Sequence, residues 1–365
     1  MIAVRILIAF AGVALVASTA RQAIQTFVVP RAVPLVLNRF VYISMRRIFH
    51  GVVRLRGATD DRIRQDGIMA SWAPLGLVAL PGVWLVLALI GYAGIFWAVD
   101  QHGVRTAAET SGSSLLTLGF VNPGGFAADM IAFSEAAVGV ALLALVIAYL
   151  PTIYAAYSRR ELVVAMLDAR AGTPPSAIQL MLRHHRYGGL ARLDQRWNEW
   201  EQWVVDIGQT HMTHPVLPFF RSPDPEHSWI TAVGALLDAA NLRLSAIVLP
   251  GGGNADASIY LTAATRVVRE IAGYFQIVVS HDGDHKLTPA EFDASLDELA
   301  AASVPIDEDR ELIWERFAAR RAQYEPALLG LASLVDAAPA PWSSDRSPPL
   351  RLPPIFRRRR PSRVR

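Results

Sequence analysis

The sequence predicts an all-α membrane protein, with three transmembrane helices, a re-entrant loop between the second and third, and a helical cytoplasmic domain. The chain of 365 residues is 52% hydrophobic and only 18% charged, which is typical of a membrane protein with a sizeable water-exposed part. Apolar stretches at residues 2–20, 72–99 and 130–157 are each long enough to cross a bilayer, which takes about 20 residues. Beyond residue 160, apolar positions recur at helical spacing without sustained β alternation.

The first helix is expected within residues 1–25, where Arg5 interrupts an otherwise apolar stretch of residues 2–20. A cleaved signal peptide is the alternative, because Ser18 and Ala20 offer small residues at a plausible cleavage site. Cleavage would leave the arginine-rich residues that follow on the outside, whereas arginines beside spanning helices stay on the cytoplasmic side. We therefore expect an uncleaved helix with its N-terminus outside.

The next segment, residues 26–68, mixes apolar residues with prolines and many arginines. An arginine at the centre of a spanning helix costs roughly 2.5–3.5 kcal/mol. We therefore expect this basic segment to lie on the inner membrane surface, with its arginines in water or among lipid headgroups. Residues 72–99 carry no charge and form the second crossing, from inside to outside, with a kink at Pro81.

The stretch between the second and third crossings is too long for a turn and too short for a domain. Residues 107–116 have the pattern of a short amphipathic helix, and residues 117–120 that of a tight turn. Non-helical backbone at membrane depth is tolerated only where it is buried in protein or lines water. This loop therefore needs partner subunits around it. The third crossing, residues 130–157, ends at Arg159 and Arg160, which mark the return to the cytoplasm.

The chain after the third crossing divides into a helical domain and a tail. Residues 336–365 are rich in proline and arginine, and we expect a disordered tail. This tail could rest on anionic lipid, where each arginine adds about 1 kcal/mol, or remain solvated without a specific role. The predicted parts are a first helix, a basic segment, a helix–loop–helix domain, a helical domain and a tail, at residues 1–25, 26–68, 69–158, 159–335 and 336–365.

Several strings of residues give a resemblance to a known family. They are TFVVPR at 26–31, TLGF at 117–120, YLPTIYAAYSRREL at 149–162, LDARAGTPPSA at 167–177, HPVLPFFRSPDPEHSW at 214–229 and YEPALLGLA at 324–332. With the order of the predicted parts, they resemble bacterial potassium-channel-like membrane proteins. The resemblance implies a pore-loop domain of the two-transmembrane type, assembled as a homotetramer in the lipid bilayer of the plasma membrane. It also implies K⁺ as the permeant ion, with no other cofactor.

The resemblance assigns residues 117–121 to a selectivity filter, in which backbone carbonyls of four copies replace the hydration shell of the ion. Thr117 would supply the filter threonine, and Leu118, Gly119 and Phe120 the next carbonyls. Gly119 suits a backbone that alternates in hand, because glycine accepts positive φ at no steric cost.

Val121 departs from the filter motif, since it stands where the motif has its second glycine. A β-branched residue at positive φ is an outlier, and a left-handed conformation costs roughly 1–2 kcal/mol per residue. The outer part of this filter is therefore expected to differ from the usual shape. A second hypothesis follows, in which a non-conducting membrane scaffold keeps the pore fold and the cytoplasmic domain is an interaction module.

Two residues of the third crossing are further candidates. Glu135 is the one charge inside that helix, and a carboxylate at membrane depth is a functional candidate. It could bond behind the filter or to the preceding short helix, or reach water at the outer end. Gly139 could be a gating hinge or a site of close helix packing, where small residues are common.

Other signals in the sequence are weak. The chain has no cysteine, so thiolate sites are excluded. Residues 280–291 imitate a calcium loop but lack its first ligand and its glycine, and the histidine pairs lack a third metal ligand. The glycine run at 251–253 follows no strand. We expect neither enzymatic activity nor nucleic-acid binding; a membrane-anchored enzyme would require a buried polar pocket in residues 160–335.

Overall fold

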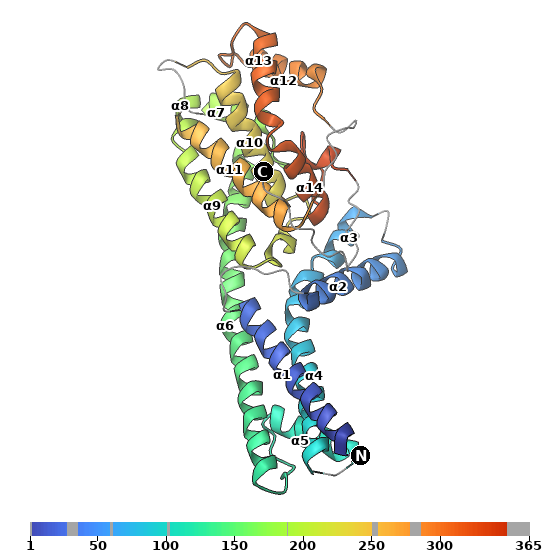
Figure 1. Cartoon of the computed structure of the whole chain (residues 1–365). Coiled ribbons are helices and arrows are strands. Elements are labelled where there is room, and N and C mark those ends of the chain that lie inside the picture. The colour runs from blue at the N-terminus through green and yellow to red at the C-terminus, as the bar shows by residue number, and fades with distance from the viewer. Residues whose placement is uncertain are drawn as a thin grey trace. The chain divides into compact units, whose positions relative to one another are not determined.

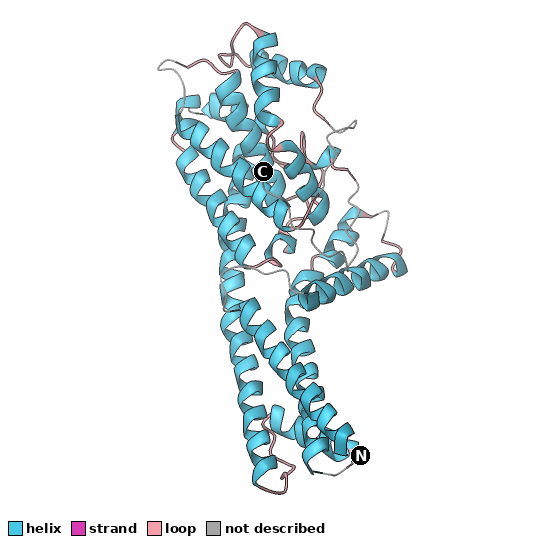
Figure 2. Ribbon diagram, in the orientation of Figure 1, coloured by secondary structure: helices cyan, strands magenta, loops and turns pink. Residues whose placement is uncertain are grey.

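The computed structural model describes residues 2–27, 36–58, 61–100, 103–187, 189–249, 255–277 and 286–348. Within these ranges every regular element is a helix, and the only β pairing is an isolated bridge between Ile247 and Ile306 (Figure 2). The predicted all-α class is confirmed. The chain forms two compact units, Met1–Ala155 and Ala156–Arg365.

Among the residues that the structure describes, three stretches are long and apolar enough to cross a membrane: Ile2–Phe27, Arg62–Val99 and Phe126–Ala171. They contain helices α1 (Ile2–Phe27), α4 (Trp72–Asp100) and α6 (Phe126–Ala171) (Figure 1). Helix α6 does not end after the predicted crossing. It passes through Pro151 and continues to Ala171, because residues beyond 160 keep the helical spacing of apolar positions. The third apolar stretch and the first helical residues of the second unit are therefore one element.

In the first unit, α1 packs along α4 through small residues. A Cβ atom placed on Gly12 would lie 2.5 Å from the carbonyl oxygen of Gly91, and one on Gly91 would lie 2.7 Å from the side chain of Val16. Both glycines therefore permit a backbone approach that any larger side chain would block, as is common between membrane helices.

The basic segment contains helices α2 (Val36–Leu55) and α3 (Arg62–Met69). Helix α2 contacts α4 and buries Val41 and Val53. Its exposed residues mix apolar and basic side chains: Phe40, Arg47, Ile48, Arg54 and Leu55. This amphipathic pattern suits a helix at a membrane surface, and the interfacial position stays a prediction. Residues 28–35, with most of the string TFVVPR, lie outside the described residues.

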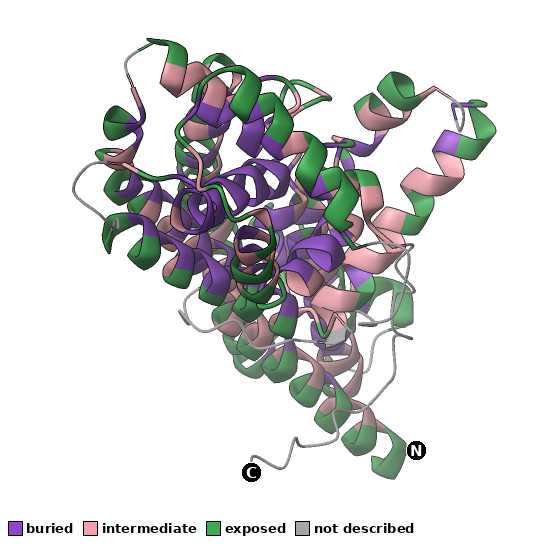
Figure 3. Ribbon diagram, turned by 90° about the horizontal axis from the view of Figure 1, so that it is seen from above, coloured by how far each residue is buried: buried purple, intermediate pink, exposed green. Residues whose placement is uncertain are grey.

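The second unit is a helical domain that begins within α6. Its further helices are α7 (Ala177–Tyr187), α8 (Leu190–Asp194), α9 (Trp197–Thr213), α10 (Trp229–Ser245), α11 (Ala255–Tyr274), α12 (Pro289–Ala301), α13 (Arg310–Arg321) and α14 (Glu325–Val335), with short 3₁₀ helices η1 (Leu217–Phe219) and η2 (Ser344–Arg346). Helix α10 is buried along nearly its whole length and forms the centre of the core. Figure 3 shows buried residues gathered centrally and exposed ones on the outer sides of the helices.

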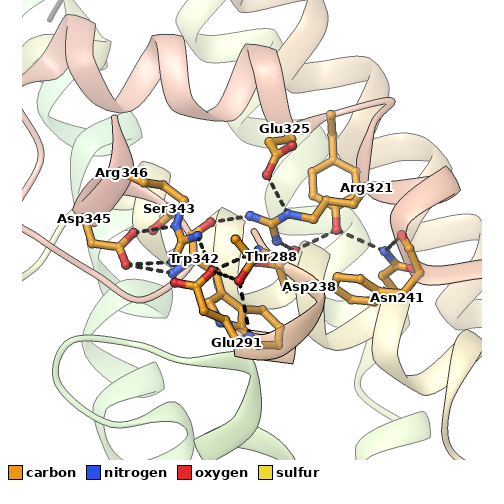
Figure 4. Close-up of polar contacts among 12 residues, drawn as sticks. Asp238, Asn241, Thr288, Glu291, Arg321, Glu325, Trp342, Ser343, Asp345 and Arg346 are labelled. Atoms are coloured by element: carbon orange, nitrogen blue, oxygen red, sulfur yellow. Dashed lines mark hydrogen bonds and ion pairs between the residues drawn. The ribbon is translucent and has the colours of Figure 1, made fainter. Parts of the chain in front are cut away.

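The predicted boundary of the disordered tail at residue 336 is wrong, because residues 336–348 pack on the helical domain. The side chain of Trp342 is only 8% exposed, and its carbonyl oxygen accepts a hydrogen bond from Arg321 in α13 (Figure 4). Arg346 forms an ion pair with Glu291 in α12. The prediction of disorder rested on the overall content of proline and arginine. It overlooked Trp342 and two alanines, Ala338 and Ala340, whose side chains are buried against the core. Residues 349–365 lie outside the described residues.

Candidate functional site

Helix α5 (Val104–Leu115) ends in a left-handed turn at Thr117, which has a φ of +53°. The N–H of Thr117 bonds to the carbonyl of Ser114 at 3.0 Å, and the N–H of Leu118 to that of Ser113 at 2.8 Å. This is the Schellman pattern, in which the left-handed residue is usually glycine. A β-branched threonine there costs roughly 1–2 kcal/mol, and backbone strain of this kind concentrates at functional sites.

Four successive N–H groups after this turn face one residue, Ser113. The N–H groups of Leu118 and Gly119 lie 2.8 and 3.5 Å from its carbonyl oxygen. Those of Phe120 and Val121 donate to its hydroxyl oxygen at 3.1 and 3.2 Å. Ser113 is itself buried at the end of α5.

The planar trans peptide fixes where the matching carbonyls point, because each N–H is antiparallel to the carbonyl of the preceding residue. The carbonyl oxygens of residues 117–120 therefore all point away from α5. Gly119 has a φ of +69°, as the sequence predicts. The backbone strain expected at Val121 is absent, since its φ is not positive. Besides Gly119, the residue of this turn with a positive φ is Thr117.

The turn is exposed in a single chain. Leu116, Leu118 and Phe120 are 54%, 61% and 67% exposed. Exposed apolar side chains of this kind contact either other protein chains or lipid in a membrane protein. In an isolated copy these three side chains are therefore largely uncovered by the chain's own helices.

Glu135 lies on α6 and contacts α5. Its side chain is fully buried, and its Oε1 atom lies 2.5 Å from the hydroxyl of Ser111. The same hydroxyl lies 3.0 Å from the carbonyl oxygen of Leu89 in α4. Of the alternatives open from the sequence, a glutamate reaching water is wrong, and a bond to the short helix is observed.

Gly139 lies against the end of α5. A Cβ atom at this position would be 2.0 Å from the carbonyl oxygen of Leu115, far inside van der Waals contact. The glycine therefore lets α6 approach the residue that precedes the turn. Of the two roles predicted for Gly139, this contact supports close packing.

Several buried polar groups of the helical domain bond to one another. Arg321 donates to Asp238 and to Glu325, and the hydroxyl of Tyr324 donates to Asp238 at 2.7 Å (Figure 4). Burial raises the pKa of Asp238, and the charge of Arg321 acts in the opposite direction. These bonds join α10, α13 and the start of α14.

A second buried cluster surrounds Arg160, which the sequence placed among the arginines marking the membrane boundary. Its side chain is 1% exposed, and it donates to the carbonyl oxygens of Leu217 and Phe220 at 2.9 and 2.6 Å. His211 lies 3.3 Å from it. Burial, followed by the charge of Arg160, lowers the pKa of His211 well below its ordinary value. Arg160 therefore holds η1 and the chain after it against α6.

The predicted weak sites gain no support. Within the described parts of the chain, no group of three His, Cys, Asp or Glu residues could hold a metal ion. The string at 280–285, which imitates the start of a calcium loop, and the glycine run at 251–253 fall outside those parts. Thr288 and Glu291, at the end of that string, form a capping box that begins α12.

Sequence reasoning missed the two serines that organise the site, Ser111 and Ser113. Both lie in the predicted short helix, and their signal was present as polar residues on a helix expected at membrane depth. Hydroxyl groups on a buried helix face need partners, and this requirement could have singled them out.

Comparisons with models of known protein families, with curated proteins and with solved structures find no match.

Proposed function

We propose that the protein is a potassium-channel-like membrane protein that conducts cations, K⁺ above all, passively through a homotetrameric pore. The single observation that carries this proposal is that the N–H groups of residues 118–121 all face Ser113, so that the carbonyl oxygens of residues 117–120 point away from it. Four copies of this turn around one axis would form rings of carbonyl oxygens, which is how K⁺ filters replace the hydration shell of the ion.

Two further features support the proposal. The C-terminal end of α5 adjoins the turn, and the negative end of a helix dipole favours a cation. The exposed apolar side chains of Leu118 and Phe120 would be covered by neighbouring copies. Assembly would thus shelter the loop from lipid, as non-helical backbone at membrane depth requires.

The proposed arrangement is a multi-pass protein of the plasma membrane. Its N-terminus is outside, and its helical domain is in the cytoplasm. The arginines of α2 and α3 support a cytoplasmic position for these two helices. The exposed face of α2, with Phe40, Ile48 and two arginines, suits the lipid headgroup region. The basic residues near the C-terminus could add contacts to anionic lipid.

A second candidate is a non-conducting scaffold that keeps the pore fold, with the helical domain as interaction module. Val121 favours it, because a valine replaces the glycine at the outer end of the filter motif. Its N–H bonds to Ser113, and its φ is not positive. A valine disfavours the positive φ that a glycine at this position would allow.

K⁺ flux from proteoliposomes separates these candidates. A working pore predicts flux with the native chain and with Val121→Gly, and loss of flux with Gly119→Ala, because alanine is strained at a φ of +69°. Gly125→Ala is the matched control, since Gly125 also has positive φ and an added Cβ would meet no neighbour within 4 Å. Flux in neither the native chain nor Val121→Gly would contradict the pore and favour the scaffold.

A further inference from the structure

Three oxygen atoms from three helices meet at Ser111. Its hydroxyl oxygen, on α5, lies 2.5 Å from Oε1 of Glu135 on α6 and 3.0 Å from the carbonyl oxygen of Leu89 on α4. Both distances are hydrogen-bond distances for an O–H donor. Each contact therefore needs a proton between its two oxygen atoms.

The protons available decide the state of Glu135. A serine hydroxyl has one proton to donate, and a backbone carbonyl has none. If Ser111 donates to Leu89, the proton in the 2.5 Å contact has to come from Glu135. If Glu135 is ionised, Ser111 must donate to it, and two oxygen atoms then face each other at 3.0 Å without a proton.

The surroundings of Glu135 point the same way. Its side chain is 0% exposed, and its Oε2 atom has no hydrogen-bond partner in the described part of the chain. A buried carboxylate with a single bond carries a penalty of several kcal/mol, which the neutral acid avoids.

Within the described residues, Glu135 forms no ion pair with a basic side chain of the neighbouring helices. On α5, Arg105 pairs with Glu109 at 2.8 Å, and the Arg105 side chain is 91% exposed. On α4, the hydroxyl of Tyr92 contacts Ser134.

We propose that Glu135 is a neutral, proton-carrying positioning residue. Its carboxyl O–H donates to Ser111, and the hydroxyl of Ser111 donates to the carbonyl of Leu89. This two-bond chain ties α4, α5 and α6 together two residues before Ser113, which holds the N–H groups of the turn. The consequence for ion flux rests on the proposed function, whereas the protonation itself does not.

Infrared difference spectroscopy of the full chain in lipid tests the protonation. The native minus Glu135→Gln spectrum at neutral pH should contain the carbonyl stretch of a protonated carboxylic acid, and ¹³C labelling of glutamate should move that band. Ser111→Ala should shift the band to higher frequency, because the acid loses its acceptor. A difference spectrum with only the paired bands of an ionised carboxylate would overturn the proposal.

Rescue by the conservative variant gives a second test. The amide of Glu135→Gln can donate to Ser111 as the acid does, so this variant should keep the thermal midpoint of the native assembly, whereas Glu135→Ala should lower it. Equal losses in both variants would contradict the proton chain. Native protein that shows the acid band but no K⁺ flux would contradict the proposed pore and still support a protonated Glu135. The failure of the proposed function can therefore be distinguished from the failure of this inference.

Discussion

The contact between Gly139 and α5 gives a quantitative prediction. An alanine Cβ at position 139 would lie 2.0 Å from the carbonyl oxygen of Leu115 and 3.1 Å from its carbonyl carbon, whereas non-bonded heavy atoms prefer separations of about 3.5 Å or more. The atoms that it meets first are backbone atoms, so no side-chain rotation relieves the clash. Either α5 or α6 must move by about 1 Å or more.

Gly139→Ala should therefore destabilise each subunit by about 1–3 kcal/mol, the usual cost of overpacking, and displace the turn that follows Leu115. The control is Gly82→Ala in α4, where an added Cβ meets nothing within 4 Å; alanine there should be neutral or stabilising, because glycine is the poorer helix former. The assays are the thermal midpoint of the assembly in lipid and K⁺ flux. A Gly139→Ala chain as stable as Gly82→Ala, with altered flux, would refute the packing account and favour a hinge.

Three further predictions follow from the polar contacts. Ser113→Ala should cost about 0.5–1.5 kcal/mol for each hydrogen bond lost and reduce K⁺ flux. Ser114→Ala should leave flux unchanged, because the Ser114 hydroxyl makes no hydrogen bond within the described residues. Equal flux in both variants would count against the role of Ser113. Asp238→Asn removes the charge that faces the buried side chain of Arg321. Denaturant unfolding should show that the helical domain loses about 3–5 kcal/mol of stability. A loss below about 1 kcal/mol would contradict the role of the buried pair. The pKa of His211 is lowered in the folded chain, so below about pH 6.5 the unfolded chain binds a proton that the folded chain does not. The contribution of neutral His211 to the free energy of unfolding is therefore complete above about pH 6.5 and falls as the pH drops below it. His211→Gln should make that acid loss smaller in thermal unfolding between pH 7 and pH 5, and an unchanged pH profile would speak against it.

The sequence predicted the elements that depend on composition and period. Apolar length alone located the three candidate spans, and the positive φ of Gly119 followed from the resemblance and the tolerance of glycine. The boundary of α6 was missed, because an apolar span and an amphipathic helix share the same period and no residue between them breaks the helix.

The remaining errors concern contacts between distant residues. The bond from Ser111 to Glu135 joins residues 24 apart in the chain, and the bond from Arg321 to Trp342 brings a stretch predicted to be disordered onto the core. Such pairs depend on which helix faces meet, which a single sequence does not specify. The same holds for the strain at Thr117, since nothing in its neighbours signals a left-handed threonine.

The number of copies in the native assembly tests the central claim most directly, because the carbonyls of residues 117–120 could line a pore only if several chains shared one axis. Native mass spectrometry of the full chain released from lipid nanodiscs should give the mass of four copies. A single copy that stays intact and folded in the same lipid would contradict the account, since the turn after α5 would then have no neighbours to enclose it.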